Sequence, residues 1–426
     1  MPSHTAPSRR APTTAALAWL TCAVTALAMT ACGSGTDGAP TRSSVQDLVS
    51  RGAVPGAAKL SQDAHGVTGF RAAGVADVRT GRPIQLADHF RAGSLTKTVI
   101  ATVTLQLVAE HRLGLDDPVA DHLPATTAAL LRPTVRGADP TDRGAGSTDR
   151  DADPTDRGAG PTARAVRPAA GETDTPDKPG ITVRQLLNHT SGLFSYTEDD
   201  AFFQEFFGEG FAAHRYESHD PGTLVRTALA HPAYAPPGTR YRYSNTDYVL
   251  LGMAIRQVTG HSYATEVRRR VILPLHLTGT SFPGTRTNLP TPHGRAYTGT
   301  HDVTDLNPSA AGAAGEMITT LPDLNRFIGA LLRGALLPPA LLRVMRDTAS
   351  SHGRYGMGLF PVRLPCHRTV WGHNGEINGS YVQALGTADG RRLVSYRANS
   401  DARFPAAVEK EFLRTEFCGG DGATGD

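Results

Sequence analysis

A serine and a lysine stand three residues apart, as Ser94 and Lys97, at the start of an apolar segment that runs from Thr98 to Leu113. At the head of a helix this spacing puts both side chains on one face, where the amine can take the proton of the hydroxyl. Only four of the 43 basic residues are lysine, and arginine does not release its proton near neutral pH. The pair therefore predicts a serine nucleophile with a lysine beside it, although an ordinary capped helix start has the same spacing.

Two further short motifs carry polar groups suited to catalysis. Tyr243-x-Asn245 follows a Pro-Pro-Gly turn and precedes an apolar helical pattern, so we expect it in a loop. His373-x-Gly375 ends a strand-like run. Taken one at a time, a loop tyrosine, a turn asparagine and a strand histidine are ordinary structural residues. Their significance therefore depends on their combination with Ser94.

A second serine, Ser191, lies in the corner His189–Gly192. It has no lysine beside it, and the chain contains no Gly-x-Ser-x-Gly elbow, so we interpret this corner as structural. The sequence also lacks the His/Glu spacing of a zinc site and the glycine-rich loop that binds phosphate. We therefore expect no metal and no cofactor.

The elements that must position these residues form two groups. Strand-like runs lie near both ends of the chain, at 57–61, 67–78, 369–373, 380–385 and 392–398. Helical patterns lie at 45–51, across 199–280 with the clearest at 247–259, at 322–332 after a Gly312–Gly315 loop, and at 405–417. We predict an α+β fold in which an antiparallel β-sheet built from both chain ends is flanked by helices and carries an inserted, mostly helical subdomain.

The chain divides into segments of different composition. We predict a signal peptide at residues 1–32, a tether at 33–42 and a polar tail at 421–426. The sheet region comprises residues 43–93 and 296–420, and the helical subdomain comprises residues 94–295. An insertion at residues 132–180 lies within the helical subdomain. The insertion contains a repeat, because Ala138–Gly146 recurs unchanged as Ala152–Gly160. It has almost no large apolar side chains and cannot offset its ordering entropy, so we expect it to be disordered and to carry no chemistry.

The start of the chain has the features of a secretion signal, with two adjacent arginines before an apolar run at 15–29 that is too short to span a membrane. Small residues before Cys32, followed by Gly33 and Ser34, resemble a bacterial lipobox. Cys32 would then be the lipidated first residue of the mature protein. Secretion after cleavage near Ala31 is the alternative. We expect an exported protein, held on the outer face of the cell envelope or secreted.

The cysteines and the net charge agree with export. Cys22 lies in the apolar run of the signal and Cys32 at its processing site, which leaves Cys366 and Cys418 as a pair for a disulfide in an oxidising compartment. Two unpaired thiols are the alternative. The formal net charge of +3 is small for 426 residues and gives no indication of a nucleic-acid partner.

Taken together, the motifs resemble those of a known superfamily. Ser94-x-x-Lys97, Tyr243-x-Asn245 and His373-x-Gly375 occur in the order and approximate spacing of the penicillin-binding, serine β-lactamase-like superfamily. The similarity is greatest to its class C-like branch, which includes D-alanyl-D-alanine carboxypeptidases, class C β-lactamases, esterases and D-amino-acid amidases. It extends from about Val45 to Phe417, excluding the insertion. The two downstream cysteines also resemble the bridge of an actinobacterial D,D-carboxypeptidase.

The resemblance implies a role for each motif. Ser94 would be the nucleophile, and Lys97 and Tyr243 would handle its proton, with either of them as the base. Asn245 would hydrogen-bond the acyl side of the substrate. The strand that begins at His373 would align the substrate by backbone pairing.

The resemblance also implies an oxyanion hole and allows this chain to be compared with its relatives at three positions. The backbone N–H groups of Ser94 and Glu376 would form an oxyanion hole. Many β-lactamases have lysine where this chain has His373, whereas the carboxypeptidase and amidase relatives have histidine. Asn374, before Gly375, replaces the hydroxyl residue common in this motif. Phe360 occupies the place from which an arginine often holds the substrate carboxylate.

The resulting hypothesis is an exported serine hydrolase that acts through an acyl-serine intermediate, with D-alanyl-D-alanine carboxypeptidase on peptidoglycan peptides as the favoured activity. The alternatives are a class C-like β-lactamase, an esterase or a D-amino-acid amidase, since fold and motif do not fix the substrate. A penicillin-binding sensor without turnover is a further alternative. The implied partners are a peptide or β-lactam substrate and peptidoglycan, with contact to a membrane only through a lipid anchor. We expect a monomer.

Overall fold

The computed structural model describes residues 44–131 and 180–419 of the chain. The predicted signal peptide with Cys32, the tether, the polar tail and the insertion as far as residue 179 lie outside the described residues. Within the described ranges, no helix is both long enough and apolar enough to cross a lipid bilayer.

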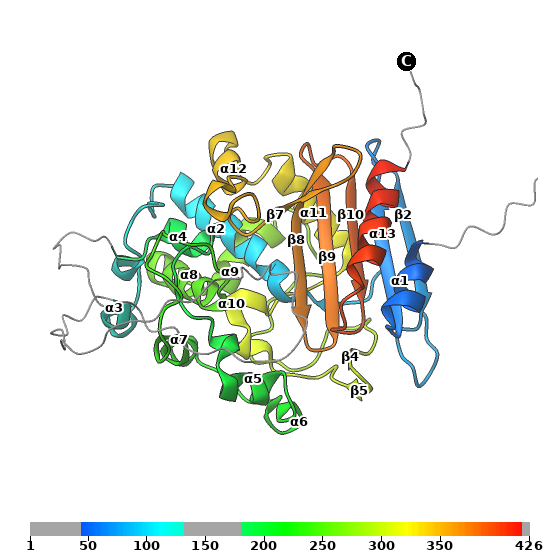
Figure 1. Cartoon of the computed structure of the whole chain (residues 1–426), viewed down its shortest axis with the longest axis horizontal. Helices are drawn as coiled ribbons and strands as arrows, with labels where there is room; N and C mark the ends of the chain where they lie inside the picture. Colours follow the sequence, from blue (N-terminus) through cyan, green and yellow to red (C-terminus); the bar gives the residue numbers. More distant parts are fainter. Residues whose placement is uncertain (1–43, 132–179, 420–426) are drawn as a thin grey trace, which may run out of the picture. The chain divides into compact units, whose positions relative to one another are not determined.

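A six-stranded antiparallel sheet with the order β2-β1-β10-β9-β8-β7 forms one part of the fold (Figure 1). Its strands are β1 (Gly56–Gln62), β2 (Thr68–Gly74), β7 (Phe360–Arg363), β8 (Thr369–Ile377), β9 (Ser380–Thr387) and β10 (Leu393–Ala398). β1 pairs with β10, so the two ends of the chain meet in the middle of the sheet. The predicted α+β class, with a sheet built from both ends, is confirmed.

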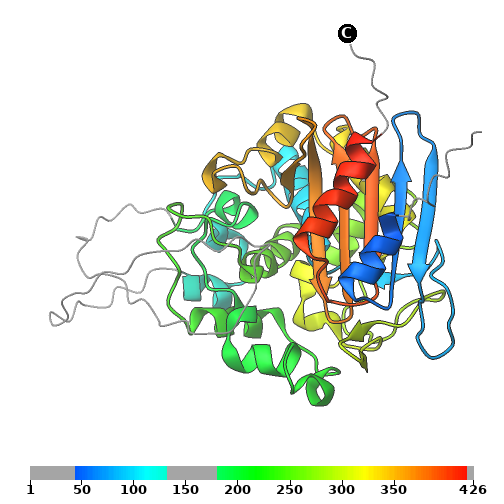
Figure 2. The ribbon, with the colours of Figure 1, turned by 45° about the vertical axis from the view of Figure 1, so that its right-hand side comes forward.

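Helices cover both faces of the sheet. α1 (Ser44–Gly52) and α13 (Ala406–Cys418) lie side by side on one face, and α11 (Leu321–Leu332) packs on the other (Figure 2). Alternation along β8 reflects this arrangement, because Val370 packs into the core under α1 and α13, whereas Trp371 packs toward α11 and the helical region. The predicted disulfide between Cys366 and Cys418 is present and joins the β7–β8 loop to the end of α13.

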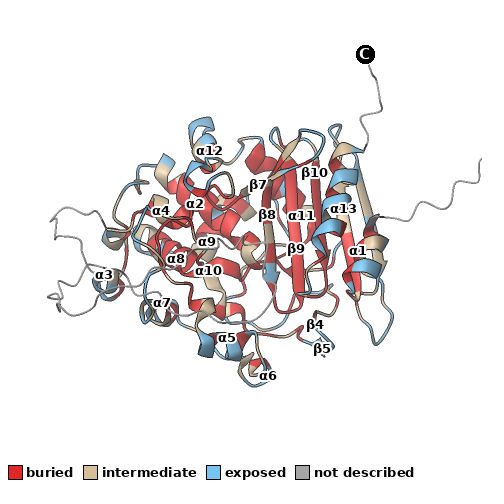
Figure 3. Ribbon diagram, in the orientation of Figure 1, coloured by how far each residue is buried: buried red, intermediate tan, exposed pale blue. Residues whose placement is uncertain are grey.

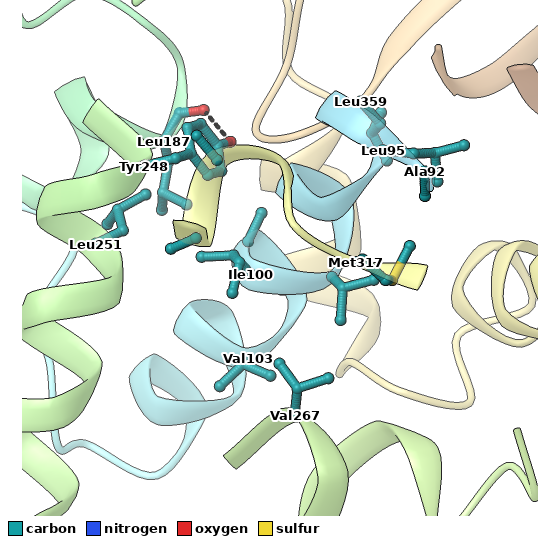
Figure 4. Close-up of a cluster of buried hydrophobic side chains, with 14 of the residues drawn as sticks. Ala92, Leu95, Ile100, Val103, Leu187, Tyr248, Leu251, Val267, Met317 and Leu359 are labelled. Atoms are coloured by element: carbon teal, nitrogen blue, oxygen red, sulfur yellow. Dashed lines mark hydrogen bonds between the residues drawn. The ribbon is translucent and has the colours of Figure 1, made fainter. Parts of the chain in front are cut away.

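The helical region is built around α2 (Thr96–Ala109), which is buried along most of its length (Figure 3). Figure 4 shows Ile100 and Val103 of this helix among apolar side chains from neighbouring elements. The threonines of α2 bury their hydroxyls without leaving them unsatisfied, because Thr98 donates to Gly358 O and Thr102 to Thr98 O. The buried helix behind Ser94 therefore forms a rigid base for the motif.

Further helices surround α2. They are α3 (Ala125–Leu131), α4 (Val183–Leu187), α5 (Asp200–Phe206), α6 (Phe211–His214), α7 (Pro221–Leu229), α8 (Asn245–Thr259), α9 (Tyr263–Val267), α10 (Gly312–Gly315) and α12 (Pro339–Met345). Two short sheets pair β3 (Phe90–Arg91) with β6 (Ile318–Thr319) and β4 (Tyr297–Thr298) with β5 (His301–Asp302).

Two local predictions were wrong. The strand expected to run to residue 78 ends at Gly74, where φ is +68° and a Cβ atom would lie 2.2 Å from Pro55 O. The predicted loop Gly312–Gly315 is the one-turn helix α10. Its glycines disfavour a helix, but Ala313 packs so closely on α8 that a Cβ atom at Gly252 would lie 2.6 Å from the Ala313 Cβ. Tertiary packing therefore overrides local propensity here.

Candidate active site

Ser94 lies in the 3₁₀ turn η1 (Gly93–Leu95), which leads directly into α2. Its hydroxyl is half-buried and accepts a hydrogen bond from Lys97 Nζ at 3.0 Å. Gly93 has a φ of +50°, and a Cβ atom there would lie 2.6 Å from both the N and the O of Glu376. Glycine at this position therefore allows the end of β8 to approach the turn that carries Ser94.

Lys97 is fully buried, and three acceptors surround its amine. Besides Ser94 Oγ, Nζ donates to Asn245 Oδ1 and to Ala314 O, each at 2.7 Å. An ammonium group has three hydrogens, so these three acceptors match its donors. The carbonyl comes from α10, the short helix that the sequence patterns did not predict. α10 therefore has a direct part in holding the lysine beside the serine.

Tyr243 approaches Lys97 from the loop before α8, and Asn245 approaches it as the first residue of α8. Lys97 Nζ lies 4.9 Å from the centroid of the Tyr243 ring. The Asn245 side chain has a fixed orientation, because Oδ1 accepts from Lys97 while Nδ2 donates to Thr197 Oγ1 at 2.9 Å. Its backbone N–H donates to Ser195 Oγ. The structure thus brings together the predicted nucleophile, the predicted proton partners and the predicted acyl-side amide, and it adds two hydroxyl residues that no motif indicated.

The free part of β8 lies beside this cluster. β7 pairs with β8 only from Thr369 to Gly372, so the edge of β8 from His373 onward is not paired with β7. The face of β8 that carries Gly375 packs on the turn before Ser94, so closely that a Cβ atom at Gly375 would lie 1.8 Å from Ala92 O. An extended substrate could pair with this edge and reach Ser94. The backbone N–H of Glu376, the second predicted oxyanion donor, lies next to the turn that carries Ser94.

His373 is buried at the start of this edge. Nδ1 donates to Asn374 O, and Nε2 lies 3.0 Å from the Tyr355 hydroxyl. Burial, with a smaller contribution from the charge of Lys97, lowers the pKa of His373 to about 3. The imidazole is therefore neutral at physiological pH. Its ring contacts are aromatic, with Phe360 at a centroid distance of 5.2 Å and Tyr355 at 5.6 Å.

The side chains of Asn374 and Glu376 lie on the other face of β8. Successive strand residues point to opposite faces, so both share the face of Val370 rather than that of His373. Glu376 accepts a hydrogen bond from Arg403 at 2.6 Å on that side. The predicted site at Glu376 therefore concerns its backbone. The carboxylate of Glu376 and the carboxamide of Asn374 therefore lie away from the Lys97 cluster.

His189 and Asp247 are polar residues at this site to which the sequence patterns assigned no function. Both are fully buried, and His189 Nδ1 lies 2.8 Å from Asp247 Oδ2. Ser191 Oγ donates to the other carboxylate oxygen at 2.5 Å. The His189 ring lies 4.3 Å from the ring of Tyr243. The sequence signal for this group is an aspartate in the first turn of an otherwise apolar helix, which is unusual in a buried element.

Across the described residues, no group of three or more His, Cys, Asp or Glu side chains is arranged to hold a metal ion.

The comparison with known proteins agrees with this geometry. Residues 41–410 match the family model described as Beta-lactamase. The chain belongs to the beta-lactamase family. The predicted superfamily is confirmed, and the protein is a serine hydrolase of the beta-lactamase and penicillin-binding type.

Curated relatives in the beta-lactamase family match part of the chain. Penicillin-binding protein 4* of Bacillus subtilis is 26% identical over 258 residues, which cover 54% of each protein. Protein flp of Staphylococcus aureus is 25% identical over 242 residues, which cover 57% of this chain and 37% of that protein. The matches therefore span only about a third to a half of the length of these relatives.

Two solved structures of beta-lactamase fold match nearly their full length. A D-stereospecific amidohydrolase from Streptomyces sp. is 39% identical with a TM-score of 0.70, covering 88% of this chain and 98% of its own. The D-amino acid amidase from Ochrobactrum anthropi SV3, complexed with L-phenylalanine, is 25% identical with a TM-score of 0.63, covering 87% and 93%.

Proposed function

We propose that this protein hydrolyses the amide bond that follows a D-configured amino acid and that its leaving group is uncharged. The observation that carries the proposal is the neutral wall at the start of the free β8 edge, where His373 contacts Phe360 and Tyr355. A substrate aligned on this edge would place one end against that wall. A carboxylate there would lose its hydration without gaining a cationic partner, which is costly.

The D stereochemistry in this proposal is based on the similarity of this chain to two solved structures. Both solved structures described above match over most of their own length, and they are a D-stereospecific amidohydrolase and a D-amino acid amidase. These activities are those of the matched proteins. Their extension to this chain is supported by the identity of 39% over 88% of its length.

The reaction would proceed in two stages at Ser94. The Lys97–Tyr243 pair takes the hydroxyl proton as Oγ attacks the carbonyl carbon, and the backbone N–H groups of Ser94 and Glu376 bind the oxyanion. The pair then returns the proton to the departing amine, which leaves an acyl-Ser94 ester. Water attacks that ester with the same pair as base, so the acid is released and Ser94 Oγ regains its proton.

A second candidate is D-alanyl-D-alanine carboxypeptidase activity on peptidoglycan peptides, as the sequence motifs favoured. The similarity to penicillin-binding protein 4* supports it. This reaction uses the same acyl-serine chemistry but releases an amino acid with a free carboxylate. Phe360 stands at the place where an arginine is expected for such a group, and Arg363 is exposed at the other end of β7, opposite Thr369.

The test compares four compounds with the full-length protein: D-phenylalanine amide, L-phenylalanine amide, a diacylated Lys-D-Ala-D-Ala peptide and a chromogenic cephalosporin. We expect ammonia release from the D-amide to be fastest, much slower release from the L-amide, and none from the Ser94→Ala variant. Faster release of D-alanine from the peptide would replace the proposal with the carboxypeptidase. Equal rates for both amides would remove the stereochemical claim.

We also propose that the protein is exported and lipidated at Cys32. The Gly33-Ser34 context of that cysteine and the disulfide between Cys366 and Cys418 support this. Incorporation of a labelled fatty acid by the wild type, and its loss in Cys32→Ser, would test it. A protein that is released unlabelled into the medium would point to plain secretion.

A further inference from the structure

His189 is joined to the loop that carries Tyr243 at three points. Its carbonyl accepts from Arg242 N at 2.9 Å, its Nδ1 lies 3.3 Å from Ser244 N, and its ring lies 4.3 Å from the Tyr243 ring. The residues on both sides of the tyrosine are therefore hydrogen-bonded to one histidine. His189 itself has a φ of +59°, a conformation uncommon outside glycine, which indicates that its surroundings hold it firmly.

Asp247 joins this histidine to α8. Its Oδ1 accepts from Ser191 Oγ, and its Oδ2 lies 2.8 Å from His189 Nδ1. Ser191 Oγ in turn accepts from Leu193 N at 3.1 Å. Asp247 lies in the first turn of the helix that begins with Asn245, so one carboxyl group connects the His189 corner to the helix that carries the acyl-side amide.

Aromatic rings enclose the other side of the imidazole. Among the described residues, His189 Nε2 has no hydrogen-bond partner, although it is fully buried. The rings of Tyr248 and Tyr355 lie 5.2 and 4.9 Å from the His189 ring. The Tyr248 hydroxyl is directed elsewhere, to Leu187 O (Figure 4). An Nε2–H group would therefore point toward aromatic faces, which accept it weakly.

The surroundings favour an uncharged pair. Burial lowers the pKa of His189 well below its usual range, and the charge of Lys97 acts in the same direction. Burial also raises the pKa of Asp247 well above its usual range, against smaller opposing contributions from Ser191 and Lys97. The titratable groups that face the pair are Lys97, Tyr241, Tyr243, Tyr248, Tyr355 and His373.

We propose that His189 and Asp247 form a neutral dyad that shares one proton between Oδ2 and Nδ1 and acts as the positioning element for Tyr243. Ser244 N–H and the shared proton both meet Nδ1, and the His189 ring packs at a tilt against the Tyr243 ring. The Tyr243 ring contacts both groups, with its centroid 4.3 Å from that of the His189 ring and 4.9 Å from Lys97 Nζ. The inference rests on the proposed acyl-Ser94 chemistry but not on the choice of substrate.

The consequence is a rate effect rather than a binding effect. Neither His189 nor Asp247 lies on the free edge of β8, so the backbone pairing of the substrate with that edge does not depend on them. A misplacement of a reacting group by about 1 Å costs roughly 100-fold in rate. Loss of the supporting ring should therefore lower kcat by roughly 10- to 100-fold and leave KM within about twofold.

The first test replaces His189 with asparagine in the full-length protein. Asparagine tolerates a positive φ, and its side-chain oxygen can accept the hydrogen bonds made at Nδ1, but it removes the ring beneath Tyr243. The matched control is His111→Asn, at an exposed histidine with a φ of +55° beyond the far end of α2. The expected result is a fall in kcat for His189→Asn alone, with both variants melting close to the wild type. Wild-type kcat in His189→Asn would overturn the proposal.

The second test compares Asp247→Asn with Asp247→Leu. In a neutral dyad the asparagine Nδ2 can donate to His189 Nδ1 while its oxygen accepts from Ser191. Leucine has a similar size but can do neither. We expect Asp247→Leu to lose at least about tenfold more kcat than Asp247→Asn. Equal losses in two folded variants would show that the carboxylate charge matters and would overturn the neutral dyad.

Two readouts separate this inference from the substrate proposal. The rate at which a fluorescent penicillin labels Ser94 reports activation of the serine even if no D-amide is hydrolysed. Carbon-13 labelling of the histidine rings gives a signal for His189 that is absent from the His189→Asn spectrum. We expect this signal not to titrate from about pH 5 to about pH 9. Titration in that range would overturn the neutral dyad whether or not the enzyme turns over any substrate.

Discussion

The rings of His373 and Phe360 lie with their centroids 5.2 Å apart, where the pairing of β7 with β8 ends and the free edge of β8 begins. Phe360 is directly opposite Gly372, so its register places it next to the histidine. The histidine is neutral because burial lowers its pKa to about 3. The wall at this end of the site is therefore uncharged, and one substitution can add a charge to it.

Phe360→Arg should shift the specificity toward substrates that end in a carboxylate. A hydrogen-bonded charge pair contributes about 1.5–3 kcal/mol, so kcat/KM for a D-Ala-D-Ala peptide should rise at least about tenfold relative to that for D-phenylalanine amide. Phe360→Leu is the control, because it removes the ring without adding a charge. An unchanged ratio in a folded Phe360→Arg variant would show that the leaving group does not reach this wall.

Lys97→Arg and Lys97→Met should both abolish most of the activity. Arginine keeps the charge but cannot release its proton near neutral pH, and methionine keeps the length without any donor. Proton transfer by a positioned group is worth about 10²- to 10⁴-fold, so kcat should fall by at least about 100-fold in each. Steady-state kinetics and thermal melting check this result. Substantial activity in Lys97→Arg would show that charge alone is needed beside Ser94.

Much of this site could be predicted from sequence, because its key residues carry their chemistry in short motifs. Ser94 and Lys97 share a face through their spacing alone, and Asn245 follows Tyr243 in a recognisable loop. Side-chain alternation also predicted the strand that carries His373 and the strand that follows it, at 369–373 and 380–385. In each case the information lies within a few neighbouring residues.

The contacts that sequence analysis did not find join residues that are distant in the chain. His189 and Asp247 are 58 residues apart and meet only because α4 packs on α8. Phe360 reaches His373 only through the register of β7 on β8. α10 forms in a glycine-rich segment that propensity assigns to a loop, and only packing on α8 explains it. Such features depend on tertiary structure, which local patterns do not encode.

Acid should destabilise the wild type partly through His373. Its pKa is about 3 in the folded protein and about 6.5 in an unfolded chain, so between these values the unfolded state binds a proton that the folded state does not. The free energy of unfolding therefore falls as pH is lowered through this window, by at most about 5 kcal/mol from this group. His373→Gln removes the titration but can still accept from Tyr355.

Denaturant unfolding at several pH values between about 4 and about 7 measures this effect. The slope of unfolding free energy against pH should be smaller in His373→Gln than in the wild type by up to one proton. The buried Asp247 contributes with the opposite sign but is present in both proteins. Identical slopes would show that His373 is protonated within the folded state.

Removal of the disulfide should lower the free energy of unfolding and leave kcat unchanged. Cys366 and Cys418 are 52 residues apart, and closing a loop of that length stabilises by about 4 kcal/mol on the chain-entropy model. The bridge holds the end of α13, which lies on the face of the sheet opposite α11 and the Lys97 cluster. The Cys366→Ser/Cys418→Ser protein should therefore unfold at lower denaturant concentration but show wild-type kcat under conditions where it is folded. A loss of kcat in the folded double variant would mean that the register of β8, and with it the edge beside Ser94, depends on the bridge.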